Sequence, residues 1–66
     1  MDQTILDEIF KIIAFYLGDS AVVMYKNFYK NKSDDLILKS ITELLNELTG
    51  PKNATRQLNK INKLLA

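Results

Sequence analysis

The chain contains no cysteine and no histidine among its 66 residues. Disulfide bonds are therefore excluded, and so is a structural zinc site, which depends on cysteine and histidine ligands. The same two absences remove the commonest general base and the best nucleophile of enzymes. We expect a protein without catalytic activity, without a bound metal and without a cofactor.

Glycine and long apolar runs are scarce as well. The only glycines are Gly18 and Gly50, so the chain has no glycine-rich loop that could hold a phosphate. The longest nearly apolar run, residues 9–17, is interrupted by Lys11 and is about half as long as a membrane-spanning helix. The opening MDQTILDE is acidic where a signal peptide would be basic. We therefore expect a cytoplasmic protein without a membrane span.

The length of 66 residues permits one domain, residues 1–66. A domain of this size buries only roughly 60% of the surface that its unfolded chain exposes, and its stability is marginal without further support. Apolar residues make up 47% of the sequence, which suffices for a folded core. Because disulfides and zinc are excluded, the remaining support is dense helix packing or association with another subunit.

The net charge of +1 conceals an alternation along the chain. Residues 1–20 carry four acids against one lysine, and residues 34–50 repeat this balance, so each block has a charge of −3. Residues 21–33 carry three lysines (+3), and residues 51–66 carry three lysines and one arginine (+4). Blocks of opposite sign attract one another where the fold places them side by side.

Turn-forming residues divide the chain into four segments of helical length. They are Gly18-Asp19-Ser20, Asn31-Lys32-Ser33 and Thr49-Gly50-Pro51. The segments predict helices at about 3–17, 20–30, 34–49 and 51–65, and tight turns between them imply antiparallel neighbours. The expected fold is all-α, a small bundle of four short helices. A strand over residues 21–25 stays open, because periodicity alone does not separate a short strand from a helix.

The segment 34–49 has the clearest pattern. Its apolar residues fall on one side of a helix that turns about 100° per residue. They are Ile37, Leu38, Ile41, Leu44, Leu45 and Leu48. Ser33 is expected to cap the start of this helix, and Gly50 followed by Pro51 is expected to end it. Ile41 and Leu45, in the middle of the apolar side, are predicted to form the centre of the core.

In the stretch YKNFYKNK, residues 25–32, aromatic residues alternate with lysines. Rings stack on bases and lysines pair with phosphates, so the stretch could be part of a nucleic-acid site. On a helix, however, four large side chains fall within an arc of about 140°, and Lys26 and Lys30 lie opposite. The four are Met24, Tyr25, Phe28 and Tyr29. This separation favours rings in the core and lysines in solvent.

The first helix carries a capping-box pattern, Thr4 and Asp7, and becomes apolar on every side after Lys11. A helix that is apolar all round is normally buried all round, and so small a chain has few elements to cover it. We therefore expect the end of this helix to form an interface, most simply that of a homodimer. The candidate interface residues are Ile12, Phe15, Tyr16 and Leu17.

The second helix is expected to have Asp19 or Ser20 as its N-cap. The stretch LGDS, residues 17–20, also resembles the Asp-Ser-Leu region of acyl carrier proteins, which are small four-helix bundles. That resemblance implies a serine, here Ser20, that carries phosphopantetheine. It covers about four residues and ends at Ala21, where the family prefers leucine. The helix that follows is basic, whereas the helix of the family is acidic.

The last helix is basic on one side. The candidate nucleic-acid contacts cluster within about 80° and are Lys52, Arg56, Lys60 and Lys63. Four amide side chains share this helix, and such residues contact phosphates and base edges. With the preceding helix and the turn at Gly50, the segment invites comparison with a helix-turn-helix. Asn46 departs from that motif, which has a small apolar residue at this position.

Two functions follow from these patterns. The favoured interpretation is a small helical protein–protein interaction or regulatory module that self-associates and has no catalytic activity. Glu43 and Glu47 lie one turn apart, but on the polar side of a helix such a pair is more typical of a solvated surface than of catalytic carboxylates. The alternative is a small DNA- or RNA-binding protein that uses the basic last helix.

Overall fold

The computed structural model describes residues 1–65, and this part of the chain forms four α-helices and no strand. The helices are α1 (Gln3–Leu17), α2 (Asp19–Tyr29), α3 (Asp34–Thr49) and α4 (Pro51–Leu65). The predicted all-α fold of four short helices is confirmed. Residues 21–25, for which a strand stayed open, lie within α2.

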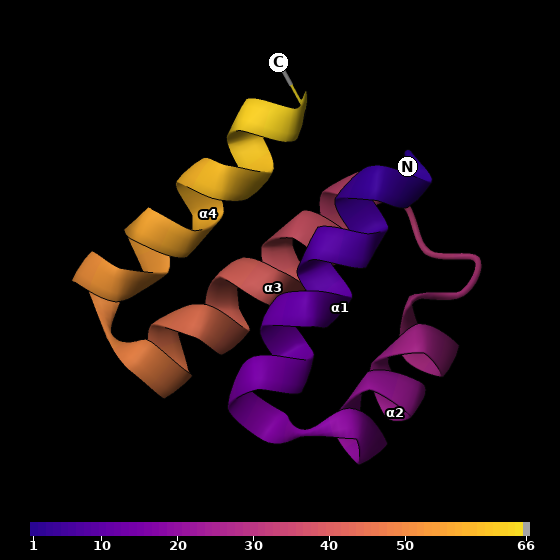
Figure 1. The fold of residues 1–66 in the computed structure, drawn as a ribbon. Helices are drawn as coiled ribbons and strands as arrows, with labels where there is room; N and C mark the ends of the chain where they lie inside the picture. Colours follow the sequence, from indigo (N-terminus) through magenta and orange to yellow (C-terminus); the bar gives the residue numbers. More distant parts are fainter. Residues whose placement is uncertain (66) are drawn as a thin grey trace.

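α1 occupies the middle of the arrangement. It packs against α2 and against α4, and α4 packs in turn against α3. Figure 1 shows α3 behind α1, with α2 and α4 on either side. α3 begins at the end of the fold where α2 stops, and it runs back in the opposite direction. α2 therefore lies at the edge of the bundle, with one close neighbour.

Single glycines make two of the three connections between helices. Gly18 joins α1 to α2 and Gly50 joins α3 to α4, with φ angles of +90° and +83°. Residues with a Cβ atom rarely adopt such angles, so glycine is required at both turns. The N–H of Gly18 donates to the carbonyl of Ala14 at 2.9 Å, and that of Gly50 donates to the carbonyl of Asn46 at 3.1 Å. Each glycine ends one helix and lets the next begin at once.

The predicted N-cap is confirmed at α3, and the predicted N-caps of α1 and α2 are wrong. Ser33 caps α3, because its Oγ accepts a hydrogen bond from the N–H of Leu36 at 3.2 Å. The predicted capping box at Thr4 is wrong, because Asp2 caps α1 and accepts from the Thr4 N–H at 3.3 Å. The predicted N-cap at Asp19 or Ser20 is also wrong. The N-cap of α2 is Gly18, which has no side chain that could accept a hydrogen bond from the first turn.

The core is formed mainly by branched aliphatic side chains of α1, α3 and α4. Its largest fully buried residues are Ile9, Ile13, Ile41, Leu45 and Ile61. The prediction that Ile41 and Leu45 lie at the core centre is confirmed, because both have an exposed fraction of 0%. α2 contributes a single buried residue, Tyr29. The bundle therefore rests on three helices, with the fourth attached at its side.

Replacing Leu45 by alanine should lower the free energy of unfolding by about 2–5 kcal/mol, because the change leaves a cavity in a closely packed core. The matched control is Leu48→Ala on the same helix, where the side chain is 42% exposed and the loss should be clearly smaller. Urea denaturation followed by circular dichroism measures both. Equal losses for the two variants would contradict the observed orientation of α3.

Candidate functional site

The four candidate interface residues at the end of α1 differ in their burial. Ile12 is buried in the core, whereas Phe15 is 78% exposed and Leu17 is also exposed. Tyr16 is half-buried, and its hydroxyl accepts a hydrogen bond from the Asn53 Nδ2 of α4 at 2.8 Å. The Phe15 and Tyr16 rings meet edge to face with centroids 5.0 Å apart. Phe15 is thus held in place at the surface but is not covered by the other helices.

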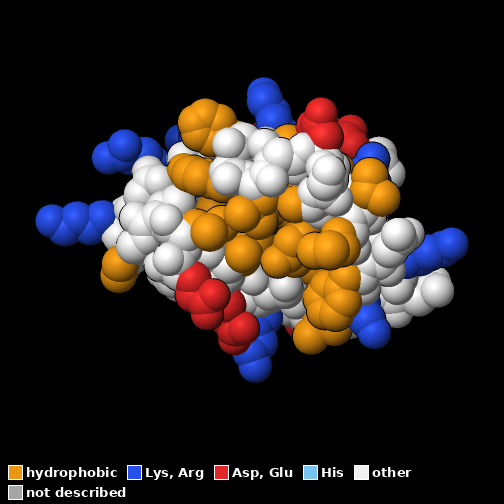
Figure 2. All heavy atoms as spheres, turned by 90° about the horizontal axis from the view of Figure 1, so that it is seen from below, with side chains coloured by type: hydrophobic (Ala, Val, Ile, Leu, Met, Phe, Trp, Pro, Cys, Tyr) orange, Lys and Arg blue, Asp and Glu red, His pale blue; other side chains and the backbone are white. Residues whose placement is uncertain are grey.

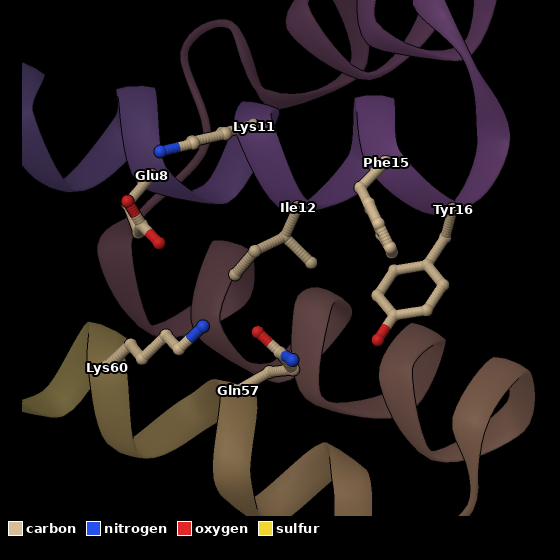
Figure 3. A pocket seen from close by; sticks show the side chains of 7 residues that line it. All are labelled: Glu8, Lys11, Ile12, Phe15, Tyr16, Gln57 and Lys60. Atoms are coloured by element: carbon tan, nitrogen blue, oxygen red, sulfur yellow. The ribbon is translucent and has the colours of Figure 1, made fainter.

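A shallow pocket of about 240 Å³ lies between α1 and α4 next to these rings (Figure 3). Its lining residues are Glu8, Lys11, Ile12, Phe15, Tyr16, Gln57 and Lys60. In Figure 3, Gln57 and Lys60 reach from α4 toward α1. Glu8 is the only carboxylate among the lining residues, and Lys11, Tyr16 and Lys60 are the other lining residues with a titratable group.

The basic side of α4 faces solvent. The four predicted nucleic-acid contacts, Lys52, Arg56, Lys60 and Lys63, are all exposed. Within residues 1–65, none of them forms an ion pair with an acidic side chain. The amides on this helix are divided, because Asn53 bonds to Tyr16 and Gln57 lines the pocket, whereas Asn59 and Asn62 are exposed. The cations are therefore available to an anionic partner, but half of the amides are turned toward α1.

The aromatic side chains of α2 are less buried than the sequence predicts. Tyr29 is buried and Tyr25 is half-buried, but Met24 is 66% and Phe28 is 50% exposed. The prediction of a core position is thus wrong for Met24 and Phe28. The reason is the place of α2 at the edge of the bundle, where α1 covers only part of the wide apolar side.

Met24 and Phe28 instead line an open groove between α2 and α3. The other lining residues are Tyr25 and Ser40, and the groove has a volume of about 410 Å³. We call it the α2–α3 groove. Figure 2, which views the molecule from below, shows that apolar side chains form a broad area across this face, with charged side chains around its margin. Sequence periodicity identifies the apolar side of α2, but it does not indicate how much of that side a neighbour covers.

Beneath this groove, one hydrogen bond joins α2 to α3. The hydroxyl oxygens of Tyr29 and Ser40 lie 3.0 Å apart. Burial raises the pKa of Tyr29 above its ordinary value of 10.0; the hydrogen bond to Ser40 opposes this shift, and the nearby Tyr25 adds to it. Tyr29 also stacks on Phe10 of α1 with ring centroids 6.2 Å apart. Tyr29 therefore contacts both α1, the close neighbour of α2, and α3.

The remaining sequence candidates lie on exposed helix surfaces. Ser20, the residue that the acyl carrier resemblance singles out, is exposed in the first turn of α2. Glu43 and Glu47 are exposed on α3. Across the described residues, no three acidic side chains come together as a metal site would require. None of the helices described is long and apolar enough to cross a membrane.

Comparison of the chain with protein-family models, with curated proteins and with solved structures found no match. Three surfaces of the molecule are candidate binding sites: the end of α1, the basic side of α4 and the α2–α3 groove.

Replacing Tyr29 by phenylalanine should cost about 0.5–1.5 kcal/mol at neutral pH through the lost hydrogen bond. At alkaline pH the difference in the free energy of unfolding between the wild type and the variant should become smaller. Above pH 10 the unfolded wild-type chain loses the Tyr29 proton before the folded chain does, so the free energy of unfolding falls toward the raised folded pKa. The phenylalanine variant lacks this contribution, whereas all other groups titrate in both proteins. Urea denaturation between pH 8 and pH 11 tests this, and parallel declines would contradict it.

Proposed function

We propose that the protein is a small helical interaction or regulatory module of the cytoplasm that self-associates and has no catalytic activity of its own. The observation that carries the proposal is the exposure of large apolar side chains in so short a chain. Besides Phe15 and Leu17 on α1, these include Val23, Met24 and Phe28 on α2. Met24 and Phe28 adjoin along the α2–α3 groove, and exposed apolar side chains that adjoin one another are typical of a binding site.

Marginal stability supports the same proposal. The buried core draws its largest side chains from three helices, and α2 is attached through few buried atoms. A chain without disulfides or zinc gains stability when a partner covers its exposed apolar surface, because anything that binds only the folded state favours folding. A second copy of the chain is the simplest partner that is always present.

The end of α1 provides the first test. If the end of α1 forms the interface, replacing Phe15 by glutamate converts the dimer to a monomer of 7.6 kDa, because a carboxylate would have to be buried in an apolar contact. Phe15→Tyr keeps the ring and serves as the matched control that should remain dimeric. Light scattering measures the mass, and circular dichroism checks that the helices are retained. A wild-type protein that stays monomeric at several hundred micromolar would overturn self-association.

The second candidate function is nucleic-acid binding by α4. It is favoured by four exposed cations on one side of a helix, without acidic partners among the described residues. Such side chains displace the counterions of a phosphate backbone on binding. The acidic blocks of the chain and its net charge of +1 provide no broad attraction, so binding would depend on this one side of α4.

Gel-shift titrations at two salt concentrations separate the two functions. If α4 binds nucleic acid, Arg56→Glu combined with Lys60→Glu should abolish binding that is tight and steeply dependent on salt. Each lost phosphate contact reduces the slope of log affinity against log salt by about 0.7–0.9. Lys30→Glu with Lys39→Glu makes the same change in net charge elsewhere and should retain most of the binding. Weak binding by the wild type at physiological salt would argue against this function.

A further inference from the structure

The least covered helix of the bundle is α2. Eleven residues do not form a stable helix in water without tertiary contacts. Here those contacts come from the buried Tyr29 and from three half-buried residues, Ala21, Val22 and Tyr25. On the other side of the helix, Val23, Met24 and Phe28 remain in solvent. α2 thus exposes three large apolar side chains, whereas the end of α1 exposes two, Phe15 and Leu17.

The α2–α3 groove has the form of a docking site for a helix. One wall is Met24, Tyr25 and Phe28, and the opposite wall includes Ser40 of α3. Methionine adapts its shape to a contact, and aromatic rings supply a large area at a small loss of side-chain freedom. Figure 2 shows a broad apolar area on the underside of the molecule, with charged side chains at its margin.

The two ends of the groove carry opposite charge. At the end where α2 stops, the Nζ of Lys32 lies over the Phe28 ring, 5.8 Å from its centroid. Toward the other end of α3, Glu43 and Glu47 follow Ser40 by three and seven residues, which places them on the same side of the helix as Ser40. Both carboxylates are exposed. Asp34 also lies near the first end, but it pairs with the amino group of Met1 at 3.1 Å.

We infer that the α2–α3 groove is the interface of a homodimer with twofold symmetry. The inference rests on the self-association proposed above and assigns it a surface and an orientation. A twofold axis across the middle of the groove reverses the direction of the second copy, so that Lys32 meets the carboxylates of the partner's Glu43 and Glu47. The same operation sets Met24 and Phe28 of each copy into the groove of the other.

The required area is available on so small a molecule. A stable interface of standard size removes about 800 Å² from each partner. The described surface of one chain is 4540 Å², so such an interface would use less than a fifth of it.

The first experiment compares three single substitutions by sedimentation equilibrium. Met24→Glu places a carboxylate in the centre of the α2–α3 groove and should raise the dimer dissociation constant at least 100-fold. Leu64→Glu makes the same kind of change on α4, where the leucine is also exposed, and should leave the dissociation constant within about twofold. Phe15→Glu identifies an interface at the end of α1 instead. Circular dichroism establishes that each variant is folded.

The second experiment tests the orientation through its charges. Lys32→Glu should weaken the dimer about 3- to 10-fold, and so should Glu43→Lys combined with Glu47→Lys, because each change makes the contacts of residue 32 repulsive at both ends of the interface. The triple variant exchanges the signs at both ends and should restore a dissociation constant close to that of the wild type. If the grooves of the two copies ran in the same direction, the exchange of charges would not restore the dimer.

The possible outcomes distinguish a wrong interface from a wrong proposal of self-association. A dimer that is lost in Met24→Glu, kept in Leu64→Glu and restored by the charge exchange supports the α2–α3 groove. A dimer that survives Met24→Glu but is lost in Phe15→Glu overturns this inference and leaves the proposed function in place. Failure of the charge exchange overturns the twofold orientation. A wild-type chain that stays monomeric overturns both the interface and the proposed self-association.

Discussion

The structure depends on one packing constraint, the burial of branched aliphatic side chains from α1, α3 and α4 at a common centre. Ile9, Ile41 and Ile61 come from three different helices and are inaccessible to solvent. Close packing at this point fixes how the three helices lie against one another, because interiors tolerate few voids. The single-glycine turns follow from it, since Gly18 and Gly50 must reverse the chain within one residue to keep these side chains together. α2 has no fully buried aliphatic residue and takes the position that remains.

The packing of three helices at one centre, with α2 beside them, explains why apolar side chains are covered in some parts of the surface and exposed in others. A chain of 66 residues can surround one central helix, but it lacks the length to surround two. α1 takes the central place, with α2 and α4 as neighbours, and even there the ring of Phe15 is left outside. The apolar side of α2 is left half covered for the same reason. Exposed apolar surface thus arises from the number of helices and their lengths; it occurs on all four helices, and α2 carries the largest share.

The sequence predicts most of the helix bounds and the core centre, because these follow from local spacing. The side of α3 that carries Ile41 and Leu45, the cap at Ser33 and the stop at Gly50 are all local properties. The exposure of Met24 and Phe28 is not local, since it depends on how far α3 lies from α2. The bond between Asn53 and Tyr16 joins residues 37 positions apart and has no signal in a single sequence. The N-cap of α2 was missed because Gly18 serves both helices at once.

The alternating charge blocks have a different role from the one that their order suggests. In the described part of the chain, the single ion pair joins Met1 to Asp34, and the lysines of residues 21–33 pair with no carboxylate. Two of them lie over rings instead, Lys26 over Phe10 and Lys32 over Phe28. Apart from Asp34, the acidic side chains of α3 therefore remain available to a partner, as do the cations of α4. Because α4 lies apart from the α2–α3 groove, a dimer built on that groove would keep both basic sides exposed, and self-association and anion binding would not compete for the same surface.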